Sequence, residues 1–426
     1  MIERTCLLTD DASLIDGETL RGRLPLDRVV TSDGEVSPGL LLDLVIPQFQ
    51  REGSLLLHGQ WADLFLQEQA ADLIRATGWR FSKIDTWTTF ERPQDKRALH
   101  VGLIPRMTSD RMPLLAPWPD ETAVRLDHWH KVTGCPWRGT PGVAGTSLMR
   151  SLAEAQLKED QEEERKSPRK RKRVLTIPRW SLQLSEDLQR AWKSPEADLG
   201  KKQWSRQEKA PFQHTYDARM MYLAAAGVSL LARDALTHTG RLPFDAALSG
   251  FWLVEFQRWG LAKVLPDPAG YGAAGPRWVT TATLQLVADQ VERGHHGGFT
   301  VLDSWTAKGY RELRRWSSTL RDAHEDPMLH DVIHDYVYRE AWGMLGRPGT
   351  RVYRPDWHAA VLATARCNLW RKMWTTYETS GQAPLHIATD AVTYASDIED
   401  PAAACPPAFD LREGLGGFRI SRSVAV

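Results

Sequence analysis

The sequence carries no net charge, because its 54 Lys and Arg are balanced by 54 Asp and Glu. Any attraction to a polyanion must therefore come from local basic patches and not from the field of the whole chain. Cysteine is also scarce. Its four copies, Cys6, Cys135, Cys367 and Cys405, include no Cys-x-x-Cys pair, which excludes a disulfide framework and favours a reducing cytoplasm.

Long apolar runs and common catalytic motifs are missing as well. No apolar stretch approaches the roughly 20 residues of a membrane span, and the acidic start MIERTCLLTDD lacks the apolar centre of a signal peptide. The chain contains no P-loop and no GxSxG motif, and no GxGxxG motif follows a predicted strand. With 426 residues, 42% of them hydrophobic and 25% charged, the chain is expected to form a cytoplasmic globular protein of two or three domains with no membrane partner.

One charged segment indicates where domains meet. An acidic block at 159–164 runs directly into a basic block at 165–173. So many charges cannot bury a core face, and the segment predicts an exposed or disordered linker. The expected parts are an N-terminal α/β domain at 1–153, a linker at 154–175 and a second domain at 176–426. The basic half of the linker is also a candidate for contact with a phosphate backbone, through Arg169, Lys170, Arg171, Lys172 and Arg173.

In the first domain, apolar runs alternate with helical patterns. Residues 53–59 and 98–105 predict short buried strands, and 63–78 predicts one amphipathic helix. A Pro/Gly-rich turn then leads into a further helix, with Thr146 or Ser147 expected near its cap. This part of the chain is expected to be mixed α/β.

The second domain is expected to be α+β. Strand-like runs accompany two long helices, at 326–346 and 355–380. Residues 384–397 predict two strands joined by a tight turn that carries Asp390.

Two aspartates stand where the local structure is expected to change. Asp217 lies at a strand end, just before a helix that begins near Tyr222, and Asp390 lies in the turn. Phosphoryl transfer to a hydroxyl commonly uses two Mg²⁺ ions about 3.5–4 Å apart. Mg²⁺ takes oxygen ligands, usually one or two carboxylates together with substrate phosphates. The two aspartates, with the Ala218 carbonyl nearby, would supply such ligands to Mg²⁺ or Mn²⁺.

The order of these segments resembles that of the family-B DNA polymerases. Residues 211–420 are similar to the palm and fingers of this family, particularly of its protein-primed branch. The first motif of the family, D-x-x-S-L-Y-P-S, matches the stretch from Asp217 and keeps the Asp and the Tyr, here Tyr222. The third motif, Y-x-D-T-D-S, matches 387–391 and keeps its second Asp, Asp390. The short L-G-x-F/W-K segment of the family resembles LGGFR at 415–419.

The resemblance implies a palm with an antiparallel sheet, helical fingers and, in place of the proofreading exonuclease, an N-terminal domain of RNase H-like or related fold. The metal-binding D-x-E of that exonuclease is absent, so no proofreading is expected. The implied partners are DNA, deoxynucleoside triphosphates and a terminal protein or other replication subunit, as in the replication of phages, linear plasmids or telomeres.

The resemblance also implies roles for side chains at the nucleotide. Tyr222 would stack under the sugar and reject a 2′-hydroxyl. The fingers motif K-x-x-x-N-S-x-Y-G places Asp335 where the family has its triphosphate-binding Lys. Arg339, one helical turn later, would substitute for that Lys. Arg321 and Arg314, on the preceding helix, are also placed to reach phosphates.

Other departures from the family concern the metal site and the grip on DNA. Ala388 replaces the first Asp of the third motif, which removes a carboxylate from the metal neighbourhood. The chain ends soon after Arg419, which leaves no room for a normal thumb, so a partner is expected to complete the grip on a primer–template.

Three interpretations stay open. The first is an active DNA-directed DNA polymerase or related nucleotidyltransferase that adds deoxynucleotides to a primer or to a protein hydroxyl. The second is a catalytically inactive, polymerase-like DNA-binding scaffold in a replication complex, which Asp335 and Ala388 favour. The third is an unrelated α/β enzyme with accidental motif matches, which would hold if Asp217 and Asp390 lay far apart in the fold.

Two further features have ordinary structural explanations. His330 and His334 have the i, i+4 spacing of metal ligands, but without a third ligand the pair favours an exposed helix. Trp342, Trp370 and Trp374 could stack on bases, although core packing is the expected role for large aromatic residues on central helices.

Overall fold

The computed structural model describes residues 5–10, 12–16, 19–25, 28–30, 36–49, 52–107, 112–166, 176–182, 185–186, 189, 204–206, 208–270 and 275–426. The chain forms two compact units. The first unit combines Met1–Ser151 with Asp322–Ala341, and the second combines Leu152–Arg321 with Trp342–Val426. The division differs from the expected domain at 176–426, because a segment from the middle of that range belongs with the N-terminal part of the chain.

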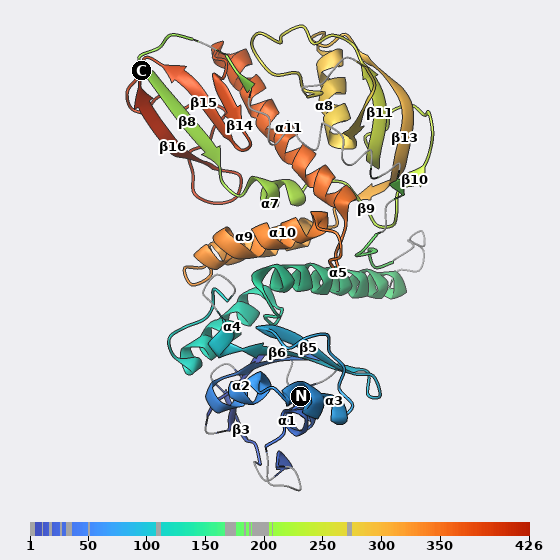
Figure 1. Ribbon diagram of the computed structural model, residues 1–426. Coiled ribbons are helices and arrows are strands. Elements are labelled where there is room, and N and C mark those ends of the chain that lie inside the picture. Colours follow the sequence, from blue (N-terminus) through green and yellow to red (C-terminus); the bar gives the residue numbers. More distant parts are fainter. Residues whose placement is uncertain are drawn as a thin grey trace. The chain divides into compact units, whose positions relative to one another are not determined.

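A six-stranded mixed sheet forms the centre of the first unit (Figure 1). Its strand order is β3-β2-β1-β4-β6-β5. The strands are β1 (Thr5–Leu8), β2 (Ser13–Asp16), β3 (Thr19–Arg23), β4 (Glu52–Leu57), β5 (Trp87–Arg92) and β6 (Arg97–Leu103). β4 is parallel to both β1 and β6, and the other neighbouring pairs are antiparallel. The two predicted apolar strands are therefore the parallel ones, whose faces are covered on both sides.

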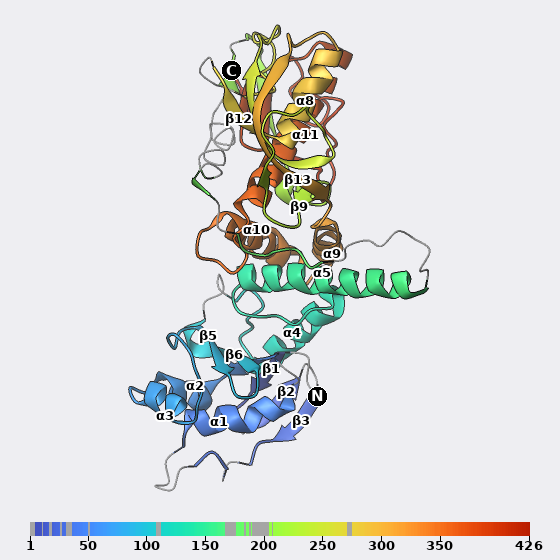
Figure 2. The same ribbon diagram turned by 90° about the vertical axis from the view of Figure 1, so that its right-hand side faces the viewer.

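Helices cover both faces of this sheet (Figure 2). They are α1 (Pro38–Val45), α2 (Gly59–Leu66), α3 (Ala70–Ala76) and α4 (Pro119–Thr133), with 3₁₀ turns at Ile46–Gln48 and Ile104–Arg106. Cys6 and Leu8 of β1 belong to the core formed with α1, α2 and α3. Leu7 is equally buried but points to the opposite face, where α4 contacts β1. The single helix predicted at 63–78 is wrong, because the chain leaves the helical conformation at Gln67 and resumes it after Gln69.

Helix α5 (Pro141–Lys166) begins earlier and ends later than the sequence suggested. Pro141 occupies the first turn, where its missing N–H costs nothing. Thr146 is therefore inside the helix, where its hydroxyl donates to the Gly142 carbonyl, and the predicted cap at this residue is wrong. Residues 154–166, expected to be part of the linker, continue the helix. Residues 167–175, which include the five basic residues proposed to touch phosphates, lie outside the described residues.

Residues 322–341 join the first unit through contacts with α4 and α5. The segment contains the end of α9 (Arg314–His324), a π-helical stretch at Val332–Val337 and the start of α10 (Tyr338–Gly346). His128 of α4 contacts Asp326 at 2.8 Å. Gly145 of α5 allows close packing, because a Cβ at this position would lie 2.6 Å from the Cβ of Ala341.

The second unit contains two antiparallel sheets of five strands each (Figure 1). The first sheet has the order β16 (Phe418–Ala425), β8 (Phe212–Ala218), β15 (Ala391–Ser396), β14 (His386–Ala388), β7 (Trp204–Ser205). The second has the order β10 (Thr237–His238), β13 (Phe299–Tyr310), β11 (Leu248–Phe256), β12 (Arg277–Thr280), with β9 (Leu231–Ala232) also paired to β13. The hairpin predicted around Asp390 is confirmed as β14 and β15.

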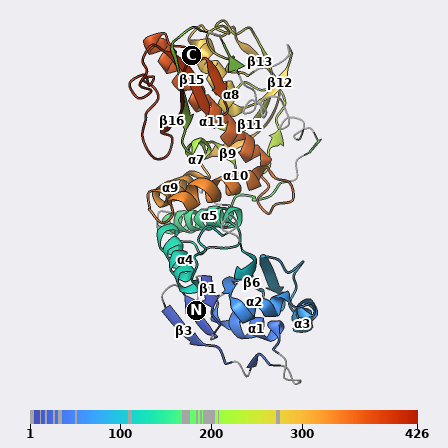
Figure 3. The ribbon, with the colours of Figure 1, turned by 60° about the vertical axis from the view of Figure 1, so that its left-hand side comes forward.

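Helix α11 (Pro355–Ser380) runs between the two sheets (Figure 1, Figure 3). Lys372 lies over the ring of Phe418 in the first sheet, and Cys367 contacts the Ala282 carbonyl beside the second. The smaller helices of the unit are α7 (Met221–Ala226) and α8 (Thr281–Glu292). The predicted limits of α11 are confirmed, since it ends at Gly381 in the left-handed conformation. Across the described part of the chain, no helix combines the length and the apolar character that a bilayer crossing requires.

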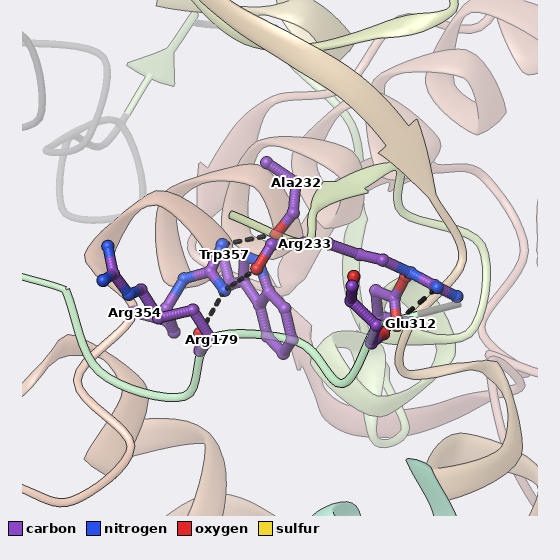
Figure 4. A network of polar contacts seen from close by, with 7 residues as sticks. Arg179, Ala232, Arg233, Glu312, Arg354 and Trp357 are labelled. Atoms are coloured by element: carbon purple, nitrogen blue, oxygen red, sulfur yellow. Dashed lines mark hydrogen bonds and ion pairs between the residues drawn. The ribbon is translucent and has the colours of Figure 1, made fainter. Parts of the chain in front are cut away.

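A buried arginine holds the start of α11 in place (Figure 4). Arg354 is 0% exposed, and its guanidinium pairs with Asp356 at 2.9 and 2.7 Å. The same group donates to the carbonyls of Arg179, Ala232 and Arg233. All five N–H groups of the side chain therefore have acceptors, as a buried charge requires. The network joins the segment at 176–182 and strand β9 to α11.

Candidate functional site

Strand pairing brings Asp217 and Asp390 next to each other in the first sheet of the second unit. Asp217 of β8 stands opposite Ala391 of β15, and Asp390 directly precedes Ala391. The Ala218 N–H donates to the Asp390 carbonyl at 3.0 Å, which ties the two backbones together. The separation that would have supported an unrelated enzyme with accidental motif matches is therefore not found.

The alternation of β8 sets the direction of the Asp217 side chain. His214 and Tyr216 are fully buried and Ala218 is 8% exposed, so these residues face the core. Successive side chains of a strand point to opposite faces, and Asp217 therefore lies on the other face, with 16% of its side chain exposed. Thr215 shares this face and bonds the Thr393 hydroxyl of β15 at 2.9 Å.

The two oxygens of the Asp217 carboxylate differ in their surroundings. Oδ2 accepts hydrogen bonds from Nε and Nη2 of Arg419, at 2.9 and 2.7 Å. Oδ1 is buried and has no hydrogen-bond partner within the part of the chain that the structure describes. A buried carboxylate oxygen without a donor is costly, and a bound cation would remove this cost.

Backbone strain occurs beside each aspartate. Met220, three residues after Asp217, has a φ of +49°, and Thr389, just before Asp390, has a φ of +57°. Side chains other than glycine rarely adopt this region, and a β-branched residue there is a real outlier. Such strain costs about 1–3 kcal/mol per residue and is concentrated at functional sites. The two turns are therefore held in unfavourable conformations at the positions that present the carboxylates.

Tyr222 belongs to a stack of three rings in the second unit. It lies parallel to Trp342 at a centroid distance of 4.4 Å, and Trp342 lies against His358 at 4.1 Å. Both faces of the Trp342 indole are thus covered, and Trp370 and Trp374 are each 5% exposed. The three Trp side chains are packed within the protein, which agrees with the core role expected for them.

The cationic candidates lie in different parts of the chain. Arg314 and Arg321 are exposed on α9, which packs against α7 through a 2.7 Å bond from the Ser317 hydroxyl to the Leu223 carbonyl. Arg339 is exposed and belongs to the first unit, with Nε 3.4 Å from the Tyr338 hydroxyl.

The histidine pair on the π-helical stretch belongs to the first unit. The ring centroids of His330 and His334 lie 6.4 Å apart, and His334 bonds the Asp335 carboxylate at 2.7 Å. Within the described ranges, no three His, Cys, Asp or Glu side chains gather as a metal site. Asp217 and Asp390 are only two carboxylates, so they do not form a group of three ligands. Two carboxylates still meet the need of Mg²⁺ where substrate phosphates complete the coordination.

Two features of the site have no counterpart in the sequence analysis. The pairing of Arg419 with Asp217 depends on strands 202 residues apart in the chain, for which no local pattern gives a signal. A cavity of about 80 Å³ adjoins the hairpin turn at Ile387 and Thr389 and is lined mainly by apolar side chains of α8 and α11. Asp267 also lines the cavity, and burial raises the pKa of its carboxyl group.

The chain as described is a mixed α/β protein in which antiparallel sheets combine with helices. Among solved structures, Phi29 DNA polymerase complexed with primer–template DNA and incoming nucleotide substrates aligns with 88% of this chain and 76% of that chain, with a TM-score of 0.49 and 10% identity. The same polymerase with single-stranded DNA gives a TM-score of 0.46 and 11% identity over 90% of this chain and 78% of that chain. No family model and no curated protein sequence matches the chain. Likeness of this degree carries no inference about function.

Proposed function

We propose that the chain is a nucleotidyltransferase that adds deoxynucleotides by two-metal-ion catalysis at Asp217 and Asp390, as a DNA-directed DNA polymerase or a close relative of one. The observation that carries the proposal is the cross-strand register, which sets the backbone positions of Asp217 and Asp390 one residue apart, on β8 and at the β14–β15 turn. The same residues carry the motif resemblance to family-B DNA polymerases, which supports the proposal.

The chemistry of the donors supports Mg²⁺ or Mn²⁺ as the cofactor. Asp217 offers a buried oxygen with no donor among the described residues, and Ala218 and Asp390, which are joined by a backbone hydrogen bond, are proposed to supply further oxygen atoms. Bound ions of this kind would neutralise charge on a triphosphate and activate an attacking hydroxyl. Arg314 and Arg321 of α9 are proposed to hold phosphates.

The aromatic stack supports a role for Tyr222 beside the sugar. Its ring is fixed against Trp342, so it would present a rigid edge to a nucleotide. A rigid ring rejects an added hydroxyl better than a mobile one, because the clash cannot be relieved by rotation. DNA, deoxynucleoside triphosphates and a terminal protein or other replication subunit are accordingly the proposed partners.

A catalytically inactive DNA-binding scaffold is the second candidate. It is favoured by the ion pair between Arg419 and Asp217, which neutralises the very carboxylate that a metal ion needs. Ala388 in place of a carboxylate favours it as well. The two candidates differ in one measurable property, which is metal-dependent incorporation of nucleotides.

The test is incorporation of labelled deoxynucleotides with Mg²⁺ or Mn²⁺ on primer–template DNA and on candidate terminal proteins. Asp217→Asn and Asp390→Asn are each expected to lower the rate by at least about 10³-fold, since metal ligation is worth several kcal/mol in the transition state. Asp397→Asn is the matched control, because this exposed carboxylate follows β15 outside the proposed site. It is expected to keep the wild-type rate.

Two other results would change the conclusion. Incorporation that survives both substitutions would place the chemistry elsewhere in the chain. No incorporation by the wild type under any condition, with DNA binding unaffected by the substitutions, would favour the scaffold.

For the first unit, we propose an RNase H-like fold without nuclease activity. The strand order β3-β2-β1-β4-β6, with β2 antiparallel and β4 and β6 parallel to β1, supports this assignment. Cys6 and Leu8 stand two residues apart on β1, with the spacing of a D-x-E pair, and both are apolar and buried. That strand β1 carries no acidic pair at these two positions supports the lack of proofreading.

A further inference from the structure

One oxygen of the Asp217 carboxylate is already paired with a cationic side chain. Arg419 stands directly opposite Asp217 in the β16–β8 register, and two of its nitrogens donate to Oδ2. Oδ1 is buried, and 16% of the Asp217 side chain as a whole is exposed. An ion that approaches Oδ2 therefore finds this oxygen already paired with the guanidinium.

The two partners differ in their freedom to move. Asp217 lies on β8, which is paired on one side with β15 and on the other with β16. Arg419 lies on β16, an edge strand whose register shifts between Ile420 and Arg422, and 46% of its side chain is exposed. An exposed arginine can leave an ion pair for water at little cost. The pair can therefore be opened by movement of Arg419 alone.

We infer that Arg419 is a positioning residue that neutralises Asp217 in the metal-free chain and leaves Oδ2 when a divalent cation binds, so that it sets the metal affinity of the site. The inference rests on the proposed function. A guanidinium and a divalent ion repel each other when both lie at the Asp217 carboxylate, because the energy of like charges rises as their separation falls. Metal loading and the position of Arg419 are thus coupled.

The first test is Mn²⁺ binding to the full chain, measured by electron paramagnetic resonance of free Mn²⁺. Arg419→Gln is expected to tighten binding by roughly fivefold, the factor that corresponds to loss of one partly exposed competing ion pair. Arg241→Gln is the matched control, because it removes the charge of an exposed arginine that lies beside the second sheet and not on β16 or β8. It is expected to leave the dissociation constant within about twofold of the wild-type value, since an exposed charge away from Asp217 is screened.

The second readout follows Arg419 itself. In ¹⁵N-labelled protein, the Nε–H resonance of Arg419 is expected to shift on addition of Mg²⁺, because its acceptor is exchanged for water. The same resonance in Asp217→Asn is expected to show no response to Mg²⁺. A fold that merely needed Arg419 for stability would not produce this difference.

The outcomes separate the inference from the proposed function. Mn²⁺ binding that depends on Asp217 and is equal or weaker in Arg419→Gln would overturn the inference and leave the proposed metal site standing. Binding found in Arg419→Gln but not in the wild type would support the inference in its strongest form. No Asp217-dependent binding in any variant would overturn both proposals.

Discussion

The stability of the folded protein is expected to depend on pH through His358, which packs against Trp342. Burial lowers the pKa of its imidazole to about 4, from an ordinary value of 6.5. Between these two values the unfolded chain binds a proton that the folded chain excludes. The stabilisation from the neutral ring is therefore complete above about pH 6.5 and is lost as the pH falls toward 4.

The prediction is that the free energy of unfolding of the wild type falls by roughly 2 kcal/mol more than that of His358→Leu between pH 7 and pH 5. Leucine keeps the volume near Trp342 and removes the titration. Urea denaturation at the two pH values, followed by tryptophan fluorescence, measures the difference. Equal losses in the two proteins would mean that His358 is free to ionise in the folded chain.

Individual residues of the site were predictable where the signal was local. Asp217 and Asp390 are marked by a strand end and a turn, which short stretches of sequence reveal. The sequence marks Arg419 only as part of a motif, since its contact with Asp217 depends on the pairing of β16 with β8. Their catalytic roles remain predictions.

At the scale of helices, one glycine decides how closely two of them pack. A Cβ on Gly145 would lie 2.6 Å from the Cβ of Ala341 and 3.0 Å from Val337, which is too close without a shift of backbone. At Gly343 of α10, in contrast, no atom of another described element lies within 4 Å of the corresponding position. The same substitution therefore has opposite consequences at two helical glycines.

Gly145→Ala is expected to lower the free energy of unfolding by about 1–3 kcal/mol, because the added methyl group overpacks the contact. Gly343→Ala is expected to raise it by about 0.5–1 kcal/mol, through the better helix propensity of alanine. Chemical denaturation of both variants beside the wild type is the measurement. A neutral or stabilising effect of Gly145→Ala would contradict the close approach of α5 to the 337–341 segment.

Long elements were predicted better than their interruptions. The limits of α11 follow from Pro355 and Gly381, and the β14–β15 hairpin follows from alternating apolar residues around a turn. The π-helical stretch at Val332–Val337 and the break between α2 and α3 gave no such signal. Both depend on which side chains reach a core, and the core is assembled from distant parts of the chain.

At the scale of the whole molecule, zero net charge makes any affinity for DNA depend on local charge. The basic run at 169–173 is the densest such group in the sequence. Replacing its five residues with Ser is expected to weaken binding to duplex DNA and to reduce the slope of log K against log salt by up to roughly 4.5, about 0.9 for each lost phosphate contact.

Fluorescence anisotropy over a series of salt concentrations measures both quantities. The control removes five exposed charges scattered over other elements, namely Arg80, Lys83, Lys96, Arg241 and Lys263. An equal change in slope for the two variants would show that total charge, and not the basic run, governs binding.

Residues 322–341 belong to the first unit although they are synthesised long after the rest of it, and this has a consequence for folding during translation. The Asp326 and Ala341 contacts of α4 and α5 cannot form until these residues have left the ribosome. At typical rates of about 5–20 residues per second, translation of the intervening chain takes roughly 10–40 s. During that interval the N-terminal segment emerges with an unfinished helical surface. The nascent chain would therefore be a natural client for chaperones that bind exposed apolar helices.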